Sequence, residues 1–216
     1  MSMSAEDYAY DQYMSDLYEE HSKEAVEEFT GERLSSYYSQ NNLLAKPAFD
    51  FFIEAKKQNA FNPTVCLLFA AIAMEVGLKA ILLKPIVHGL VHDESAASLI
   101  TDLTVSHSGM DRYRNLLLHI LKEYGGVDLN TFKRAESSKT LWEERKRVQD
   151  IRNSIMHRAN KASQEDADLA LDVASEILEK IFPEVVTRMG FHLHDGYQIC
   201  SDWKCKHKGS ASGISL

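Results

Sequence analysis

The stretch LWEERKRVQDIRNSIMHRANK, residues 141–161, decides the fold of this chain. Thr140 and Glu143 carry the signature of a capping box, in which each side chain bonds a backbone N–H of the first helical turn. Apolar residues then recur at helical spacing and give one stripe: Leu141, Val148, Ile151 and Ile155. The stretch therefore predicts an amphipathic helix that packs against other helices.

The same stretch carries many cations: Arg145, Lys146, Arg147, Arg152, Arg158 and Lys161. Arg152 and His157 stand five positions apart, and on an ideal helix such side chains point about 140° from each other. Asn153 and His157 are four apart and can share a face. Arg152 and His157 can therefore line one cleft only if the helix unwinds near His157 or if another surface completes the cleft. A second copy of the chain across a two-fold axis would do so.

The segment RNSIMH, residues 152–157, resembles the R-x4-6-H signature of the HEPN (higher eukaryotes and prokaryotes nucleotide-binding) superfamily. An earlier segment, AMEVGLKA at residues 73–80, resembles the family's Glu-containing helix, and the resemblance covers roughly residues 48–182. It implies an all-α, HEPN-like antiparallel bundle that dimerises with its paired motifs in a cleft between protomers. It also implies endoribonuclease activity, and it places Glu75 behind Arg152.

These residue types suit RNA cleavage by attack of the RNA's own 2′-hydroxyl group. His157 can transfer the proton near neutral pH, and the planar fork of Arg152 can hold phosphate oxygens. Asn153 can orient either group. Four cations are candidates for binding the RNA backbone: Arg145, Arg147, Arg158 and Lys161. The sequence has no carboxylate cluster of the kind that binds Mg²⁺, so we expect a reaction without metal or cofactor.

Two alternatives stay open. Arg and His near a helix C-terminus also complement the helix dipole, and the chain would then be a non-catalytic HEPN module that dimerises or binds nucleotide, RNA or a partner protein. Glu75 can instead pair with Lys79, four residues on. In HEPN toxins with a nucleotidyltransferase antitoxin, a modified Tyr often follows the His by two, but Ala159 stands there. The resemblance thus favours a standalone toxin or an anti-phage defence protein, with an antitoxin or defence-system partner still possible.

Composition is that of a globular protein of 216 residues, 44% hydrophobic and 26% charged. Its net charge of −8 excludes a general nucleic-acid coater, so RNA contacts must be local to residues 141–161. Three cysteines (Cys66, Cys200 and Cys205) give no disulfide framework. The acidic N-terminus lacks the apolar core of a signal peptide. We therefore expect a cytoplasmic protein.

Three regions are expected: a helical extension at residues 1–42, the bundle at 43–186, and a hairpin with a flexible tail at 187–216. Residues 64–84 are apolar nearly throughout, but Glu75 and Lys79 would be costly in a bilayer. We expect a central buried helix that ends at Pro85, with no membrane contact. Ser163 and Asp166 predict a capping box for the last bundle helix, which should end before Pro183.

Alternation on either side of Asp195-Gly196 predicts a β-hairpin with a two-residue type I′ turn. This segment contains several metal-capable side chains: His192, His194, Cys200, Cys205 and His207. Their spacing matches no established zinc pattern. We therefore expect an ordinary exposed hairpin in preference to a structural zinc site, and no metal in the candidate active site.

Overall fold

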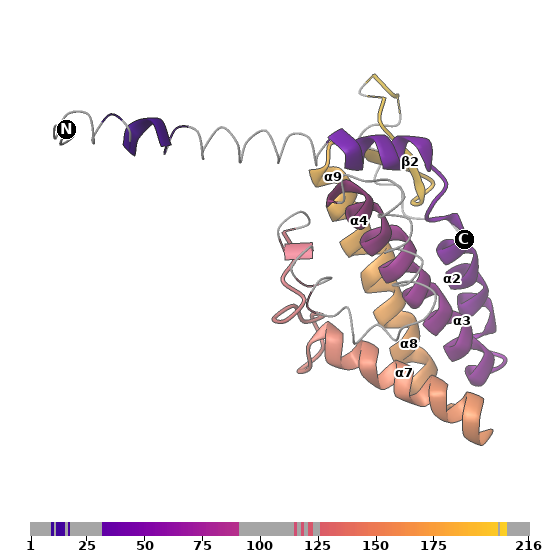
Figure 1. Cartoon of the computed structure of the whole chain (residues 1–216). Coiled ribbons are helices and arrows are strands. Elements are labelled where there is room, and N and C mark those ends of the chain that lie inside the picture. Colours follow the sequence, from indigo (N-terminus) through magenta and orange to yellow (C-terminus); the bar gives the residue numbers. More distant parts are fainter. Residues whose placement is uncertain are drawn as a thin grey trace.

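The structure is a computed structural model that describes residues 10, 12–15, 17, 32–90, 115, 118, 121–122, 126–202 and 204–206. Within these residues it consists of helices and one two-stranded antiparallel sheet near the C-terminus (Figure 1). The predicted all-α class and the C-terminal hairpin are confirmed. The HEPN-like topology of the bundle stays a prediction.

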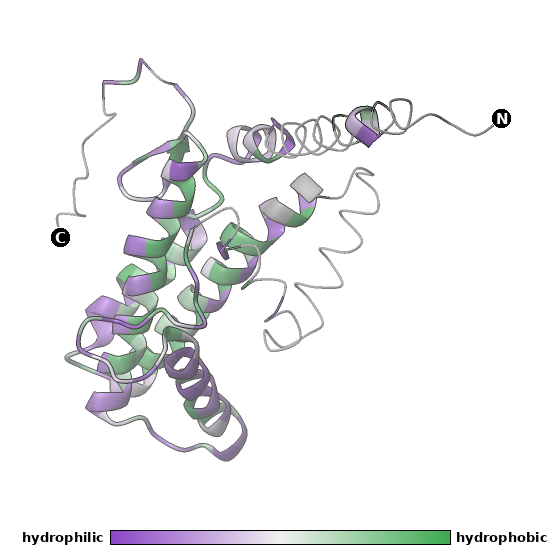
Figure 2. Ribbon diagram, turned by 90° about the vertical axis from the view of Figure 1, so that its left-hand side faces the viewer, coloured by the Kyte–Doolittle hydropathy of each residue, from purple (hydrophilic) through white to green (hydrophobic). Residues whose placement is uncertain are grey.

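Two long helical runs form the centre of the bundle. The first consists of α3 (Pro63–Val76), the π-helical segment η1 (Gly77–Leu83) and α4 (Lys84–Leu90). The second consists of α8 (Gln164–Ser175), the π-helical segment η3 (Glu176–Ile181) and α9 (Phe182–Arg188). Two further helices pack against them, α2 (Lys46–Gln58) and α7 (Leu141–Arg158). Apolar surfaces of these helices face the interior in Figure 2.

Small side chains let α3 and α8 approach closely. Ala70 and Ala73 on α3 and Ala167, Ala170 and Ala174 on α8 are fully buried. α3 contacts α2, α7 and α8, so it is the central helix that the sequence predicted. Among the described residues, Pro63–Leu83 is the one helical segment long and apolar enough to cross a membrane, and 56% of an apolar 18-residue window within it is buried inside the protein. That burial is the behaviour expected of a core helix.

Both long runs continue through a proline at which we expected them to end. Pro85 lies inside α4 and Pro183 inside α9, so those two predictions are wrong. A π turn precedes each proline: the N–H of Lys84 bonds the carbonyl of Lys79, and the N–H of Phe182 bonds that of Ile177. Proline has no N–H and clashes with the carbonyl four residues back in a regular helix. The wider π turn shifts the hydrogen-bond ladder just before each proline and accommodates it.

Residues 32–40 form a helix that packs on the central run. Tyr38 is fully buried, and its hydroxyl donates to the carbonyl of Ile81 at 2.9 Å. In a regular α-helix that carbonyl would have bonded the N–H of residue 85, which proline lacks. Tyr38 therefore gives this carbonyl a side-chain donor beside Pro85. Leu34 enters the same core, so packing continues across the predicted boundary at residue 42.

The hairpin consists of β1 (His192–His194) and β2 (Gln198–Cys200). Asp195 and Gly196 have φ of 50° and 78°, and the N–H of Tyr197 bonds the carbonyl of His194, as in the predicted type I′ turn. His194 then pairs with Gln198, so Tyr197 is an extra residue in the connection. The two-residue loop was therefore wrong by one residue.

One face of this hairpin belongs to the core. Ile199 is 3% exposed, its N–H bonds the carbonyl of Asn42 at 2.9 Å, and Leu193 packs beside it. The rings of Phe191 and Tyr38 lie 5.7 Å apart. The expectation of a freely exposed hairpin was wrong for this face, and the core also crosses the predicted boundary at residue 186.

Candidate functional site

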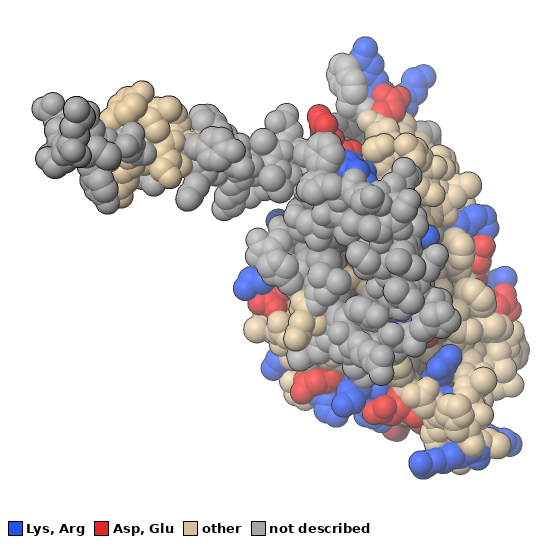
Figure 3. Space-filling model, viewed as in Figure 1, with Lys and Arg blue, Asp and Glu red and all other residues tan. Residues whose placement is uncertain are grey.

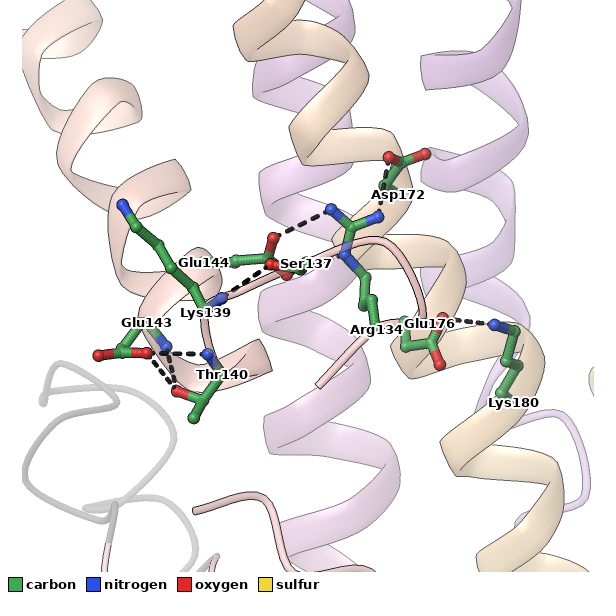
Figure 4. Close-up of polar contacts among 9 residues, drawn as sticks. All are labelled: Arg134, Ser137, Lys139, Thr140, Glu143, Glu144, Asp172, Glu176 and Lys180. Atoms are coloured by element: carbon green, nitrogen blue, oxygen red, sulfur yellow. Dashed lines mark hydrogen bonds and ion pairs between the residues drawn. The ribbon is translucent and has the colours of Figure 1, made fainter. Parts of the chain in front are cut away.

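The capping box predicted for α7 is present. Thr140 Oγ1 accepts the N–H of Glu143 at 3.3 Å, and Glu143 Oε2 accepts the N–H of Thr140 at 2.8 Å (Figure 4). α7 then runs without a break to Arg158. It lies across the lower end of the bundle in Figure 1 and contacts α3 and α8.

Arg134 fixes the first turns of α7, and nothing in the sequence singled it out. Its Nε and Nη2 donate to the two carboxylate oxygens of Glu144 at 2.8 and 3.0 Å, and its Nη1 donates to Asp172 at 2.8 Å (Figure 4). The hydrogen bond to Glu144 raises the pKa of the Arg134 guanidinium above its ordinary value. Burial alone would raise the pKa of Glu144, but hydrogen bonds from Arg134 and Ser137 outweigh it and hold that pKa below its usual value.

The inner side of α7 faces α3 across a small crevice. Its volume is about 10 Å³, room for roughly one water molecule. Seven residues line it: Ala71, Met74, Glu75, Leu78, Arg145, Gln149 and Arg152. Arg145 is 2% exposed, bonds Gln149 and lies 4.4 Å from the ring centroid of Trp142. The expectation that Arg145 belongs to the RNA-binding surface was therefore wrong, because the side chain is inside the protein.

Arg152 is half-buried at this crevice. Its Nη1 donates to Asn153 Oδ1 at 3.2 Å. Glu75 lines the same crevice and also accepts a hydrogen bond from Lys79 at 2.6 Å. The predicted pair with Lys79 is thus confirmed, and Glu75 is a neighbour of Arg152 as well.

His157 lies on the opposite, solvent-facing side of α7. It is exposed, and it comes three residues after Ser154 and seven after Asp150, so the three side chains share a face. An open groove of about 450 Å³ follows that face. Its lining combines cations and carboxylates with one apolar and one neutral polar residue: Lys139, Glu143, Lys146, Arg147, Asp150, Ile151 and Ser154.

Three of the predicted RNA-binding cations are accessible. Arg147 is 53% exposed and has a long ion pair of 3.4 Å with Asp166. Arg158 and Lys161 are exposed and, among the residues that the structure describes, have no ion-pair partner. Lys and Arg side chains lie at the lower edge of the molecule in Figure 3, where α7 ends. Those two cations follow His157 in the sequence, at one and four positions.

The end of α7 is held firmly. Ala159 adopts a left-handed conformation with φ of 54°, and its N–H bonds the carbonyl of Ile155. Asn160 bonds Ser154 at 2.6 Å, and the N–H of Ala162 bonds Thr64 in the first turn of α3. His157 therefore stands on an ordered last helical turn.

Arg152 and His157 do not meet within one chain. α7 is helical through both residues, so unwinding near His157 is excluded as a way to bring them together. Of the two routes considered, completion of the cleft by another surface stays as a prediction.

Comparison of the chain with protein-family models, with curated proteins and with solved structures finds no match.

A second group of reactive side chains lies on the hairpin. The ligand atoms of His192, His194, Cys200 and Cys205 all lie within 4.8 Å of one another. His207, the fifth metal-capable residue in the sequence, lies outside the described residues. From the sequence we did not expect a zinc site here, because the spacing of these residues matches no established zinc pattern.

Proposed function

We propose that this chain is a HEPN-like endoribonuclease that cleaves RNA without a catalytic metal and acts as a homodimer. The observation that supports it is the R-x4-H pair on an unbroken helix whose last turn is exposed, ordered and cationic. The all-helical bundle and the position of Glu75 beside Arg152 agree with it. A role as a toxin or a defence effector, with an antitoxin or defence-system partner, follows from the family resemblance alone.

The divergence of Arg152 and His157 is the reason for proposing a dimer. One chain presents His157 to solvent and Arg152 on the other side of the same helix. A two-fold axis beside the end of α7 gives each His an Arg from the other copy, because such an interface uses the same surface twice. The exposed apolar side chain of Met156, between the two residues of the motif, is available to such an interface.

In the proposed reaction, His157 takes the proton from the 2′-hydroxyl group, and the 2′-oxygen attacks the adjacent phosphorus. Arg152 bonds the non-bridging oxygens of the phosphorane, where negative charge accumulates. The bond from phosphorus to the 5′-oxygen breaks, and that oxygen takes a proton from water. The products are a 2′,3′-cyclic phosphate and a 5′-hydroxyl. Asn153, bonded to Arg152, sets the direction of the guanidinium.

RNA reaches this site through a local cationic surface. Arg158 and Lys161 are exposed at the end of α7 and Arg147 is exposed in its first half, whereas the chain as a whole carries a net charge of −8. Contacts with phosphates at such a surface are sequence-independent and weaken with added salt. We therefore expect RNA binding that is confined to this end of the molecule.

A second candidate is a non-catalytic module that uses the same surface to dimerise or to bind nucleotide, RNA or a partner protein. One observation favours it: Arg152 is half-buried, bonded to its neighbour Asn153, and faces a crevice of its own bundle. A guanidinium in that position can serve packing alone.

Cleavage of RNA by the full-length chain separates the two candidates. We expect the wild type to cut RNA with EDTA present, and to leave DNA intact because DNA lacks the 2′-hydroxyl. Arg152→Ala and His157→Ala should each lose at least about 100-fold in rate, and Arg152→Lys should recover little. Lys46→Ala, which removes an exposed cation at the start of α2, is the matched control. Equal cleavage by wild type and His157→Ala, or no cleavage by folded wild type, would leave the non-catalytic module.

A further inference from the structure

We propose that His192, His194, Cys200 and Cys205 bind one structural Zn²⁺ ion. The four ligand atoms come from both strands of the hairpin and from the turn that follows it, and they meet within 4.8 Å. The site is independent of the proposed ribonuclease function.

The extra residue Tyr197 creates this arrangement. Side chains on paired strands share a face when their residues are direct partners, and His192 is the direct partner of Cys200. His194, two residues along β1, lies on the same face. With a two-residue loop, Cys200 would pair with Phe191 and point to the core. The one-residue difference in register therefore places three ligands on the outer face of the hairpin.

Cys205 completes the set from outside the sheet. The N–H of Cys205 bonds the carbonyl of Asp202 in a turn, and its Sγ lies 3.1 Å from His194 Nε2. The Nε2 atoms of His194 and His192 are 3.2 Å apart. Three ligands of the group thus converge on the space beside one imidazole nitrogen.

The 3.2 Å between the two nitrogens matches a tetrahedral metal site, and the 3.1 Å between Cys205 Sγ and His194 Nε2 is about 0.5 Å shorter than in such a site. Zinc bonds of about 2.0–2.1 Å to nitrogen and about 2.3 Å to sulfur put two nitrogens about 3.3 Å apart, and a nitrogen and a sulfur about 3.6 Å apart. Hydrogen bonding explains the convergence less well. A neutral imidazole nitrogen either donates one hydrogen or offers one lone pair, yet His194 Nε2 contacts both His192 Nε2 and Cys205 Sγ. A cation among the four groups bonds every one of them.

The ligand types select zinc and a structural role. Two thiolates and two imidazoles at tetrahedral vertices are a set typical of Zn²⁺, and four protein ligands leave no open position for a substrate. The other face of the hairpin is anchored in the core by Ile199. The ion would therefore fasten the segment around Cys205 to a hairpin that is itself part of the bundle.

Metal content and cobalt spectra test this site in the full chain, expressed without added histidines and purified in reducing buffer. We expect one zinc per chain by elemental analysis. Cobalt should replace it and give thiolate-to-metal charge-transfer bands together with the intense visible bands of tetrahedral Co²⁺. Excess chelator should lower the melting temperature by about 5–10 °C, because it removes a ligand of the folded state.

Variants identify the ligands. Cys205→Ser and His194→Gln should lose the metal, whereas Cys66→Ala and His157→Ala, which remove a cysteine and a histidine elsewhere, should retain it. Since a lost ligand can also unfold the hairpin, His192→Cys provides the complementary case: it should keep the metal and strengthen the charge-transfer band, because three thiolates then replace two. Three results would overturn the proposal. The wild-type protein could contain no stoichiometric zinc or cobalt, Cys205→Ser could retain the metal, or the isolated protein could contain a Cys200–Cys205 disulfide.

Discussion

At the scale of single residues, Arg134 and Glu144 form a buried ion pair with matched geometry. Their side chains are 17% and 6% exposed, and the guanidinium bonds both carboxylate oxygens. Removing one partner of such a pair leaves a charge in a poorly solvated position. Asp172 also bonds Arg134 but is 59% exposed, so water replaces it readily.

We predict that Glu144→Gln lowers the free energy of unfolding at pH 7 by about 3 kcal/mol, the lower end for a broken buried pair, because Asp172 remains. The pKa of Glu144 is lower in the folded than in the unfolded chain. Its contribution is therefore complete above the unfolded pKa of about 4.3 and is lost as the pH falls through the folded value. Urea unfolding of wild type and variant between pH 7 and pH 3 should show the difference shrinking in that acidic range.

Asp172→Asn is the control for this pair. It removes the exposed partner and should cost less than about 1 kcal/mol. An equal loss of unfolding free energy in the two variants would show that the buried pair contributes no more to stability than the exposed one.

The cations of the R-x4-H helix divide into buried and exposed residues, and the two kinds should respond differently. We predict that Arg158→Ala and Lys161→Ala each weaken RNA binding. Each should also reduce the magnitude of the slope of log K against the logarithm of the salt concentration by about one. Arg145→Ala should instead lower the melting temperature, since Arg145 is 2% exposed and stacks on Trp142. Binding titrations at several salt concentrations, with melting curves, measure both effects. A normal melting temperature for Arg145→Ala would contradict its structural role.

At the scale of elements, two π turns let the long helices pass their prolines. η1 and η3 pack against each other, and a Cβ added to Gly77 in η1 would lie 2.9 Å from Leu178 in η3. The end of the Leu178 side chain would have to shift to admit a Cβ at Gly77. The first run also needs Tyr38, whose hydroxyl bonds the carbonyl of Ile81.

We predict that Tyr38→Phe costs about 1–3 kcal/mol of unfolding free energy, because a buried carbonyl loses its donor. Pro85→Ala restores a backbone N–H four residues after Ile81, so Tyr38→Phe should cost less in that background. The coupling in a double-mutant cycle of chemical denaturation measures the compensation. Strictly additive losses would mean that Tyr38 does not replace the donor missing at Pro85.

Local signals in the sequence were enough for the capped starts of α7 and α8 and for the type I′ turn. Thr140 with Glu143 and Ser163 with Asp166 form capping boxes because both partners lie within one turn. The failures share a different cause. The π turns before Pro85 and Pro183 and the burial of Arg145 depend on packing between helices distant in sequence, which propensity and spacing do not contain. The extra residue Tyr197 could have been predicted locally, since a three-residue loop also fits the sequence.

At the scale of the whole molecule, the proposed catalytic site belongs to two chains. Each 24.5 kDa chain carries one Arg152 and one His157 on divergent sides of α7. Light scattering of the wild type at micromolar concentration should therefore give twice the mass of one chain. A monomer that retained ribonuclease activity would exclude the composite site.

Mixed dimers test which chain supplies each residue. Arg152→Ala and His157→Ala, each inactive alone, should recover about a quarter of wild-type activity when unfolded together and refolded at equal concentrations. Half of the dimers are then mixed, and each mixed dimer has one complete site of two. The double variant Arg152→Ala/His157→Ala refolded with wild type is the control, since its mixed dimers have no complete site if Arg and His act across the interface. That control should show only the activity of its wild-type homodimers, about a quarter of the wild-type value. About half of the wild-type value there, with no recovery in the mixture of single variants, would mean that both residues act from one chain.

Because His192 pairs with Cys200, the faces of the hairpin depend on whether the connection changes by an odd or an even number of residues. Adding or deleting one residue between His194 and Gln198 would exchange the two faces of β2, bringing Cys200 toward the helices and Ile199 toward water. A change of two residues would keep both faces in place. Among descendants of a common ancestor, the length of this connection should therefore drift in steps of two wherever both cysteines persist, and single-residue changes should coincide with their loss.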